Sequence, residues 1–376
     1  MKRALPLLLA LALAPTTAPR AQDLALPILV PLTGFAALEG TSQRNGALLA
    51  AREIGDIAFK PEVLDTQTTP EGAIAAWSRA VGPGNLPPAV VGPILGTQML
   101  ALLPLAQQRG VSMLTVSGTA RLSEMGNPQL FRFFPSDQVV KVAHARYVAQ
   151  TLGARRPAVI FQSTAYGQSG REQLARSFAE LGTPPVLEES VGPQVNDLTP
   201  ALVRARAANA DVLVLHLHAP STALAVRQAR QLMPSLPIVA GSAMHQPATA
   251  ALLEPAELKG ICAETASSPV SAISLPMRAF LDAYRAQWRG DPDAFAAAQY
   301  DSVHMLARVI RRLRAAGKPA DAASVRDGLA REEWRGVAAS YRSDGRGNMA
   351  HEAEIVCYDG LSRVPKLATR FSFPPG

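Results

Sequence analysis

The sequence predicts an α/β protein built as two lobes, each a parallel sheet flanked by helices. Short apolar runs of strand length alternate with amphipathic stretches of helical length, which is the pattern of βαβ units. This alternation occurs twice along the chain. The 376 residues, 48% of them hydrophobic and 18% charged, also exceed what one core usually holds. A single very large sheet is the alternative, and the length disfavours it.

The first series of elements covers residues 25–116. Its expected strands are residues 25–30, 62–65, 89–91 and 112–116, and its expected helices are residues 41–54, 70–81 and 97–109. The first of these helices is indicated by Ala47, Leu48, Ala51 and Ile54, which share one face at helical spacing. Strand and helix therefore alternate without interruption through this part of the chain.

The second series covers residues 157–240, after an intervening segment at 128–137. Its expected strands are residues 157–161, 186–191, 212–216 and 237–240, and its expected helices are residues 168–181, 198–208 and 222–232. Beyond Glu264 the order changes to long helices at 275–289 and 294–316, followed by short strands around 337–341 and 353–358. A late segment that adds to both lobes implies that the chain crosses between them several times.

The first 21 residues have the pattern of a secretory signal. Lys2 and Arg3 give a basic start, residues 4–14 form an apolar run, and Ala21 supplies a small residue at the expected cleavage site. The run is too short to span a bilayer, so we expect no membrane anchor. A buried N-terminal helix is the alternative, which two prolines in the segment disfavour.

The net charge of +7 does not indicate binding to nucleic acid. Loss of the leader removes Lys2, Arg3 and Arg20 and no acid, so the count becomes 37 − 3 = 34 basic against 30 acidic side chains, or +4. Nucleic-acid binding needs a clustered basic stripe, whereas most of these residues are scattered. The one dense group, four arginines within residues 308–314, has the spacing of a solvated helix face. An anion-binding patch is the alternative.

The two cysteines, Cys262 and Cys357, both lie in strand-like apolar segments. Disulfides persist in proteins exported from the cytoplasm. If the two strands are neighbours, a disulfide would close a loop of about 95 residues. The loop-entropy estimate for the stabilisation by such a bond is roughly 4–5 kcal/mol, before any strain. Two separately buried thiols are the alternative.

The sequence carries none of the usual catalytic signatures, so neither an enzyme nor a bound cofactor is expected. It contains no GxSxG, no glycine-rich loop ending in GK[ST] and no HExxH. Residues 345–350 formally fit GxGxxA, but they do not open a helix after a strand and predict a hairpin turn instead. His216 and His218 would share one face of a strand, yet no nearby acid or cysteine cluster completes a metal site.

Small polar residues follow several predicted strands at the point where each strand ends. They occupy residues 33–40, 92–97, 117–119 and 163–170. In doubly wound sheets, ligands bind beyond the carboxyl ends of the strands, where helix N-termini present unpaired N–H groups. Thr97, Ser117 and Thr119 offer hydroxyls suited to a carboxylate. Helix capping by these residues is the alternative.

Six short motifs, in order along nearly the whole mature chain, carry a family resemblance. They are PLTG at 31–34, RNGA at 44–47, VVGP at 90–93, FRFFPSD at 131–137, AYGQ at 165–168 and DAFAAAQYD at 293–301. The set resembles periplasmic binding proteins of the leucine/isoleucine/valine type. The resemblance implies the type I periplasmic binding fold, with two Rossmann-like lobes joined by a three-crossing hinge. On this division, residues 22–136 and 267–336 form the first lobe, and residues 137–266 and 337–376 form the second.

The resemblance also implies positions for the ligand. Gly96, Thr97, Ser117 and Thr119 match the positions that bind a ligand carboxylate, and Tyr166 matches a ligand-facing aromatic residue. The complete set of predicted ligand-binding residues is Glu39, Leu95, Gly96, Thr97, Ser117, Gly118, Thr119, Tyr166, His218, Ala243 and Phe295.

Two matched positions depart from the family pattern. The acid that usually holds the ligand's α-ammonium falls at Ala243, and a further aromatic position falls at His218 or Ala219. Burying an ammonium without a partner costs several kcal/mol. Either Glu39 substitutes for the missing acid, or the ligand lacks an amine and is an aromatic or aliphatic carboxylate, or an amide. His218 would then be a polar contact, with a surface histidine as the alternative.

The predicted function is that of a periplasmic solute-binding protein of an ABC importer. Its expected partners are a small carboxylate-bearing ligand and the importer's permease subunits, and the expected state is a monomer. Ligand binding would shift an equilibrium between open and closed lobes. A periplasmic sensor that presents the ligand to a membrane signalling partner is one alternative, and a secreted hydrolase is another.

Overall fold

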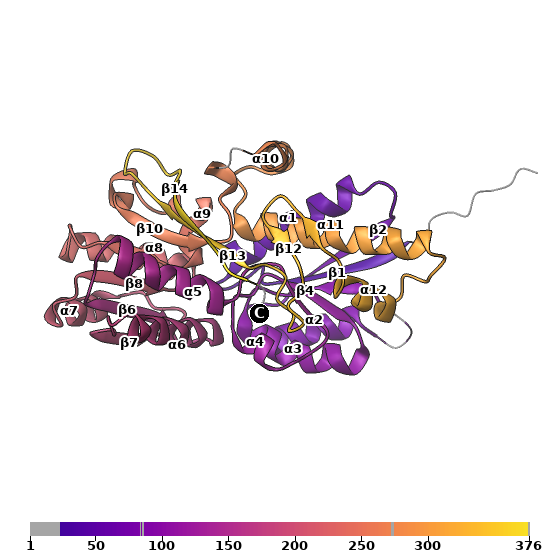
Figure 1. The fold of residues 1–376 in the computed structure, drawn as a ribbon, viewed down its shortest axis with the longest axis horizontal. Helices are drawn as coiled ribbons and strands as arrows, with labels where there is room; N and C mark the ends of the chain where they lie inside the picture. The colour runs from indigo at the N-terminus through magenta and orange to yellow at the C-terminus, as the bar shows by residue number, and fades with distance from the viewer. Residues whose placement is uncertain (1–22, 83, 85, 272–273, 375–376) are drawn as a thin grey trace, which may run out of the picture.

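The computed structural model of the chain describes residues 23–82, 84, 86–271 and 274–374. These residues form two lobes that lie side by side along the long axis of the molecule (Figure 1). Each lobe contains a parallel sheet with helices packed on it, which confirms the predicted α/β fold of two lobes. The predicted signal sequence, residues 1–21, lies outside the described residues.

The first lobe contains a five-stranded parallel sheet in the order β2-β1-β3-β4-β5. Its strands are β1 (Leu24–Val30), β2 (Phe59–Asp65), β3 (Ala89–Val91), β4 (Ser112–Thr115) and β5 (Leu130–Arg132). The helices α1 (Ala37–Glu53) and α11 (Ala294–Ala315) pack on one face, and α2 (Pro70–Ala80) and α3 (Gly96–Arg109) pack on the other. A shorter helix, α12 (Ala322–Leu329), follows α11 and joins the same core.

The inner strand β1 shows why this sheet is covered on both faces. Ile28 packs in the core beneath α1 and α11, whereas the next residue, Leu29, packs in the core beneath α2 and α3. Successive side chains of a strand point to opposite faces of the sheet. Because residues 26–30 are all buried, the strand reads as a continuous apolar run, as buried parallel strands do.

The second lobe contains a seven-stranded sheet in the order β14-β13-β10-β9-β8-β6-β7. Five strands are parallel, namely β6 (Pro157–Gln162), β7 (Leu187–Val191), β8 (Val212–His216), β9 (Ile238–Ala240) and β10 (Ile261–Thr265). The strands β13 (Glu352–Cys357) and β14 (Lys366–Ser372) add antiparallel at one edge. The helices α5 (Asp137–Arg146) and α6 (Ala165–Glu180) pack on one face, and α7 (Thr199–Ala207) and α8 (Ala219–Leu232) pack on the other.

The chain passes between the lobes three times. The first passage joins β5 to α5, and the second joins β10 to α10 (Leu275–Gln287) and α11. The third runs from the hairpin of β11 (Trp334–Arg335) and β12 (Ser340–Tyr341) into β13. The first and third passages are paired, because Arg132 forms a parallel bridge with Asn348.

Among the elements of the second lobe that were not predicted from the sequence, the two longest are α5 and β14. The helix α5 continues into a five-residue π-helical segment (Tyr147–Thr151), and it lies directly after a motif that the sequence marks only as a link between lobes. The strand β14 is an edge strand whose residues are exposed or half-buried, so it lacks the apolar run that identifies the other strands. Its pairing with β13 is therefore a tertiary effect.

The expected strand at 337–341 is in fact part of the β11–β12 hairpin, which lies outside both large sheets. The buried carboxylate of Asp301 explains the turn, since its two oxygens accept hydrogen bonds of 2.8 Å from the backbone N–H groups of Val337 and Ala338. The segment at 345–350 is a turn, as predicted, with positive φ at Gly345 and Gly347.

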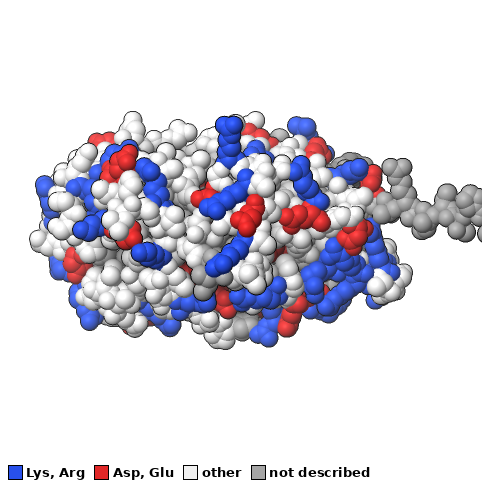
Figure 2. All heavy atoms as spheres, turned by 90° about the horizontal axis from the view of Figure 1, so that it is seen from above, with Lys and Arg blue, Asp and Glu red and all other residues white. Residues whose placement is uncertain are grey.

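Charged side chains on the face shown in Figure 2 are interspersed, with the larger group of basic side chains toward the right-hand end. Arg308 and Arg312 both pair with Glu332, and Arg311 pairs with Asp56. Three of the four arginines of the predicted helix face are therefore held in ion pairs with two acids, which disfavours an anion patch. Among the helices that the structure describes, none is both long enough and apolar enough to cross a membrane.

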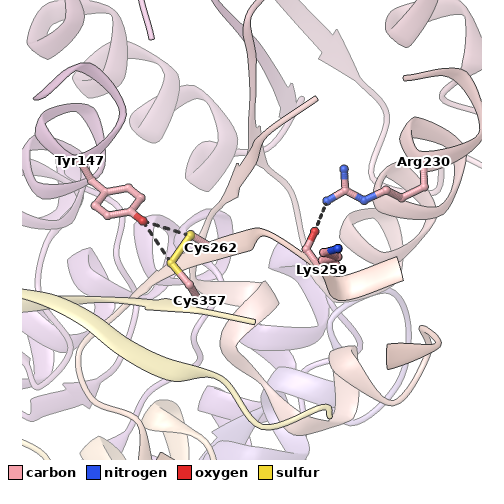
Figure 3. The surroundings of a disulfide bond; sticks show 5 residues. All are labelled: Tyr147, Arg230, Lys259, Cys262 and Cys357. Carbon is pink, nitrogen blue, oxygen red and sulfur yellow. Dashed lines mark hydrogen bonds between the residues drawn. A yellow bond between two sulfur atoms is a disulfide. The ribbon is translucent and has the colours of Figure 1, made fainter. Parts of the chain in front are cut away.

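A disulfide joins Cys262 of β10 to Cys357 of β13 (Figure 3), with the sulfurs 2.06 Å apart. The two residues are directly paired in the antiparallel ladder between these strands. The hydroxyl of Tyr147 lies 3.3 Å from Sγ of Cys262 and 3.2 Å from Sγ of Cys357. The bond therefore fixes the returning C-terminal segment to the second sheet.

Candidate functional site

A narrow cavity lies between the two lobes, and its volume in this arrangement of the lobes is only about 20 Å³. Its walls come mainly from loops and helix starts that follow the carboxyl ends of strands, where ligands bind in open α/β sheets. The lining residues from the first lobe and the first passage are Glu39, Ile94, Val116, Gly118, Phe134, Asp137 and Phe295. Those from the second lobe are Tyr166, His218, Ser242 and Ala243.

The start of α6 places Tyr166 at the cavity. Thr164 caps the helix, because its Oγ1 accepts a hydrogen bond of 3.1 Å from the backbone N–H of Gly167. Gly167 lies so close to β6 that a Cβ there would be 1.8 Å from the carbonyl oxygen of Gln162. The helix can therefore begin directly after the strand, and its first turn brings the phenol ring to the cavity wall.

Two acidic side chains line the cavity although both are almost fully buried. Glu39, in the first turn of α1, is 2% exposed, and Asp137, at the start of α5, is 0% exposed. Each has one oxygen that accepts a hydrogen bond, and one oxygen, here called the free oxygen, with no partner among the described residues. The free oxygens are Oε2 of Glu39 and Oδ1 of Asp137.

The bound oxygens of the two acids are held from the second lobe. Oε1 of Glu39 accepts a hydrogen bond of 3.0 Å from the backbone N–H of Ala219, at the start of α8. Oδ2 of Asp137 accepts one of 2.7 Å from Oγ of Ser169, on α6. Burial raises the pKa of Asp137 to about 7, although Lys141 and the bond from Ser169 act in the opposite direction.

Aromatic rings form much of the remaining wall. The ring of Tyr166 lies 5.1 Å from that of His218, and the ring of Phe134 lies 4.9 Å from that of Phe295, centroid to centroid. His218 is 5% exposed, so the alternative of a surface histidine is wrong. Its Nδ1 lies 3.4 Å from Oε1 of Glu39, which brings an aromatic ring and an acid together at one end of the cavity.

A buried ionic group lies behind the second-lobe wall. Glu264 of β10 contacts the ammonium of Lys141 and, at 2.9 Å, Nδ1 of His144, and all three side chains are fully buried. Burial alone would raise the pKa of Glu264, but Lys141 and His144 outweigh it and hold that pKa well below its usual value. Oγ of Ser242 donates to Glu264 at 3.2 Å, so the group reaches the cavity wall through Ser242.

The hydroxyls predicted to bind a carboxylate lie beside the cavity and do not line it. Ser117 and Thr119 are buried, and each hydroxyl oxygen is without a hydrogen-bond partner in the described part of the chain. Thr119 packs against the start of α3, where a Cβ on Gly96 would be 2.1 Å from its Oγ1. The helix-capping alternative fails for Thr97, since the N-cap of α3 is Leu95 and has no side-chain cap.

Arg132 holds the backbone of this loop in place. Its Nη1 donates to the carbonyl oxygens of Ser117, at 3.2 Å, and of Thr119, at 2.7 Å. The side chain is fully buried, and burial lowers its pKa to about 10, which leaves it protonated at neutral pH. The loop is therefore rigidly attached to β5 and to Asn348, which also accepts from Arg132.

The structure brings six of the eleven predicted site residues to the cavity. These are Glu39, Gly118, Tyr166, His218, Ala243 and Phe295. Five others, Leu95, Gly96, Thr97, Ser117 and Thr119, lie outside the lining. Sequence reasoning missed Ile94, Val116, Phe134, Asp137 and Ser242 as lining residues.

The sequence held signals for most of the missed residues. Phe134 and Asp137 belong to the motif at 131–137, and Ser242 directly precedes a predicted site residue. Ile94 and Val116 come just after strands and beside the predicted polar segments. No three His, Cys, Asp or Glu side chains among the described residues are placed to hold a metal ion.

This fold and cleft are those of a family of two-lobed binding proteins. The family model described as periplasmic binding protein matches residues 24–359, and the chain belongs to this family. A relative, the Leu/Ile/Val-binding protein of Rhizobium johnstonii, is 26% identical over 229 residues, which are 59% of this chain and 62% of the relative. The match therefore spans less than two thirds of that relative's length.

Two solved structures share the fold over nearly the whole chain. A substrate-binding protein of a branched-chain amino acid transporter from Streptococcus pneumoniae, in complex with isoleucine, has a TM-score of 0.81 and 23% identity, covering 92% of this chain and 99% of that one. A solute-binding protein of an ABC transporter from R. palustris, in complex with 4-hydroxybenzoate, has a TM-score of 0.82 and 17% identity, covering 93% and 97%. At these identities the likeness shows the fold alone.

Proposed function

We propose that the protein is the solute-binding component of an ABC importer and binds a small carboxylate-bearing ligand between its lobes. The observation that carries the proposal is a cavity lined from both lobes, with buried polar atoms that lack partners among the described residues. Such a cavity is the default binding site in a two-lobed α/β protein. The relatives support the class, since one is named as a Leu/Ile/Val-binding protein and another was solved with an aromatic acid.

The proposed cycle is hinge closure. Ligand binds first to one lobe, and the contacts from the other lobe form only when the lobes close, so binding free energy favours the closed state. The importer's permease would recognise the closed pair of lobes. The lobe division proposed is residues 22–136 with 267–336 and residues 137–266 with 337–376, and the three passages would serve as the hinge.

The protein is proposed to act in the periplasm as a monomer, after removal of the leader near Ala21. It would release its ligand unchanged, without catalysis. Ser117, Thr119 and the N-terminus of α3 remain the proposed carboxylate site, because a buried hydroxyl without a partner gains most from a ligand acceptor. For these hydroxyls to reach the ligand, the wall at Gly118 has to shift.

The test is mass spectrometry of small molecules released from the purified mature protein, followed by a thermal-shift screen. The screen should include α-amino acids and amine-free carboxylates such as 4-hydroxybenzoate. The proposal expects a released compound or a screened acid to raise the melting temperature in proportion to the logarithm of its concentration. A protein that releases nothing and is stabilised by none of these compounds would contradict it, as would recovery of a chemically altered ligand.

A further inference from the structure

We infer that the ligand carries an ammonium group and that Glu39 and Asp137 bind it from two sides of the cavity. The inference rests on the proposed function, since it takes this cavity as the ligand site. It names both the chemical class of the ligand and the residues that recognise it. These residues replace the acid that the family pattern would place at the position of Ala243.

The first ground is that both acids are buried and that one carboxylate oxygen of each has no hydrogen-bond partner among the described residues. Glu39 and Asp137 line the same cavity, and each free oxygen is shielded from water. A buried carboxylate is stabilised by an opposite charge or by several hydrogen-bond donors, and otherwise costs several kcal/mol. Each acid receives a single hydrogen bond from the second lobe. An ammonium group carries a positive charge and three donors, which is one donor more than the two free oxygens require.

The second ground is that the residue packed against the free oxygen of Asp137 is a glycine. The backbone N–H of Asp137 donates to the carbonyl oxygen of Gly118 at 2.7 Å, so the two residues are locked together. A Cβ on Gly118 would lie 3.2 Å from Oδ1 of Asp137 and 3.8 Å from the ring of Tyr166. Any side chain at position 118 would therefore crowd this oxygen, whereas glycine leaves the position next to it free of side-chain atoms.

The third ground is that no cationic side chain among the described residues contacts either free oxygen, since the imidazole of His218 lies 3.4 Å from the bound oxygen of Glu39, Oε1. Of the described residues that line the cavity, none is a lysine or an arginine. Lys141 lies one turn along α5 from Asp137, but its ammonium contacts Glu264. Arg132 is directed to the 117–119 loop and to Asn348. The charge that completes the site has to come with the ligand.

The rest of the cavity wall is apolar and suits an apolar ligand body once the lobes open. Ile94, Val116, Phe134 and Phe295 are buried side chains of the wall, and the faces of aromatic rings also favour a nearby cation. An α-amino acid with an apolar side chain and a plain amine share this chemistry. A benzoate without an amine does not, since its only charge would meet two carboxylates.

The experiment uses two matched sets of probes with the full mature protein. One set is leucine, 3-methylbutylamine and 4-methylpentanoate, and the other is phenylalanine, 2-phenylethylamine and 3-phenylpropanoate. Titration calorimetry is run at pH 8, and any small molecule released from the protein is tested for an amine by dansylation. We expect binding by at least one amine-bearing probe of a set, weaker or no binding of the amine-free acid of that set, and an amine in any released compound.

The variants Glu39→Gln and Asp137→Asn remove charge while keeping an oxygen that can accept from Ala219 or Ser169. Each should weaken amine binding at least tenfold while leaving the melting temperature of the unliganded protein at or above that of the wild type. Gly118→Val should weaken it as well, because the side chain would cover Asp137. Glu354→Gln is the matched control, since Glu354 is a buried acid on β13, paired with Arg370 and outside the cavity. It should bind as the wild type does.

The outcomes separate the inference from the proposed function. Tight binding of amine-free acids with no binding of amines would leave a solute-binding protein and overturn the inference. Wild-type amine affinity in both Glu39→Gln and Asp137→Asn would also overturn it. If no probe binds and no compound is released, the proposed function fails and the inference fails with it.

Discussion

The carboxylate of Glu39, in the first lobe, accepts a hydrogen bond of 3.0 Å from the backbone N–H of Ala219, the first residue of α8 in the second lobe. The acceptor lies at the positive end of a 14-residue helix, where a negative charge is favoured. Ser169 makes a second connection, because its Oγ accepts from the backbone N–H of Ala120 at 2.8 Å and donates to Asp137. Contacts between the lobes and contacts around the cavity therefore involve the same residues.

Glu39→Ala should hold the lobes apart more than Glu39→Gln does. The alanine removes the acceptor for Ala219, whereas glutamine retains an oxygen in its place. We expect small-angle X-ray scattering at saturating ligand to give a larger radius of gyration for the alanine variant than for the glutamine variant. The ligand affinity of the alanine variant should be about tenfold lower than that of the glutamine variant, which corresponds to about 1.4 kcal/mol of binding free energy. Equal radii and affinities in the two variants would show that the bond to α8 does not contribute to closure.

Thr119→Val should separate ligand binding from folding. The Thr119 hydroxyl is buried and has no hydrogen-bond partner within the described residues, so its replacement by a methyl group of similar shape removes an unsatisfied polar atom. We expect chemical denaturation to show equal or greater stability. If the hydroxyl binds a ligand carboxylate, calorimetry should show affinity for the carboxylate-bearing ligand reduced about tenfold. Unchanged affinity would place Thr119 outside the site.

Parallel sheets and loops at strand ends could be predicted because both follow from local patterns. The apolar run of β1 and the cap at Thr164 are properties of a few consecutive residues. The segments after strands therefore included Glu39, Gly118 and Tyr166, which do line the cavity.

Asp137 could not be recognised in the same way. Its role depends on burial, on Ser169 from another helix and on the absence of a side chain at Gly118, none of which is local in sequence. The same holds for the edge strand β14, which pairs with β13 although its own residues carry little apolar signal. The hydroxyls of Ser117 and Thr119 differ from Asp137, because the sequence predicted them to contact the ligand. In the structure they are buried next to the cavity and are not among its lining residues.

Loss of the Cys262–Cys357 disulfide should lower stability and leave ligand affinity nearly unchanged at temperatures where the protein is folded. The bonded cysteines are 95 residues apart in sequence. The loop-entropy estimate for the stabilisation of the folded state by such a crosslink is roughly 4–5 kcal/mol. The paired residues lie on β10 and β13, and neither lines the cavity. The measurement is denaturant unfolding of the double Cys→Ala variant against the wild type with and without reductant. A variant as stable as the oxidised wild type would contradict the prediction.

Lys141→Met should destabilise the protein by about 3–5 kcal/mol, because it leaves the buried charge of Glu264 without its ammonium partner. The double variant Lys141→Met with Glu264→Gln should recover much of this loss, since it removes both charges. Urea unfolding of the two single variants and the double variant forms a double-mutant cycle that measures the coupling. Additive effects in the cycle would show that His144 and Ser242 alone neutralise the cost of burying Glu264.

Affinity for an ammonium-bearing ligand should fall as the pH drops below about 7. Burial raises the pKa of Asp137 to about 7, so the unliganded carboxyl is increasingly protonated in acid, and a protonated carboxyl attracts an ammonium weakly. The neighbours that also act on this group are Lys141 on the same helix, Ser169 on α6, Glu264 on β10 and Arg132 on β5. Bound ammonium stabilises the carboxylate, which lowers its pKa and releases a proton on binding.

The pH dependence has a defined sign and a defined control. The dissociation constant should rise by up to about tenfold for each pH unit well below 7, because one proton competes with the ligand, and it should level off above pH 8. Calorimetry in buffers of different ionisation enthalpy should detect close to half a proton released near pH 7. In Asp137→Asn this proton release and most of the pH dependence should disappear, because the titrating group is gone. The same profile in the wild type and in Asp137→Asn would assign the titration to another group and remove Asp137 from the ammonium site.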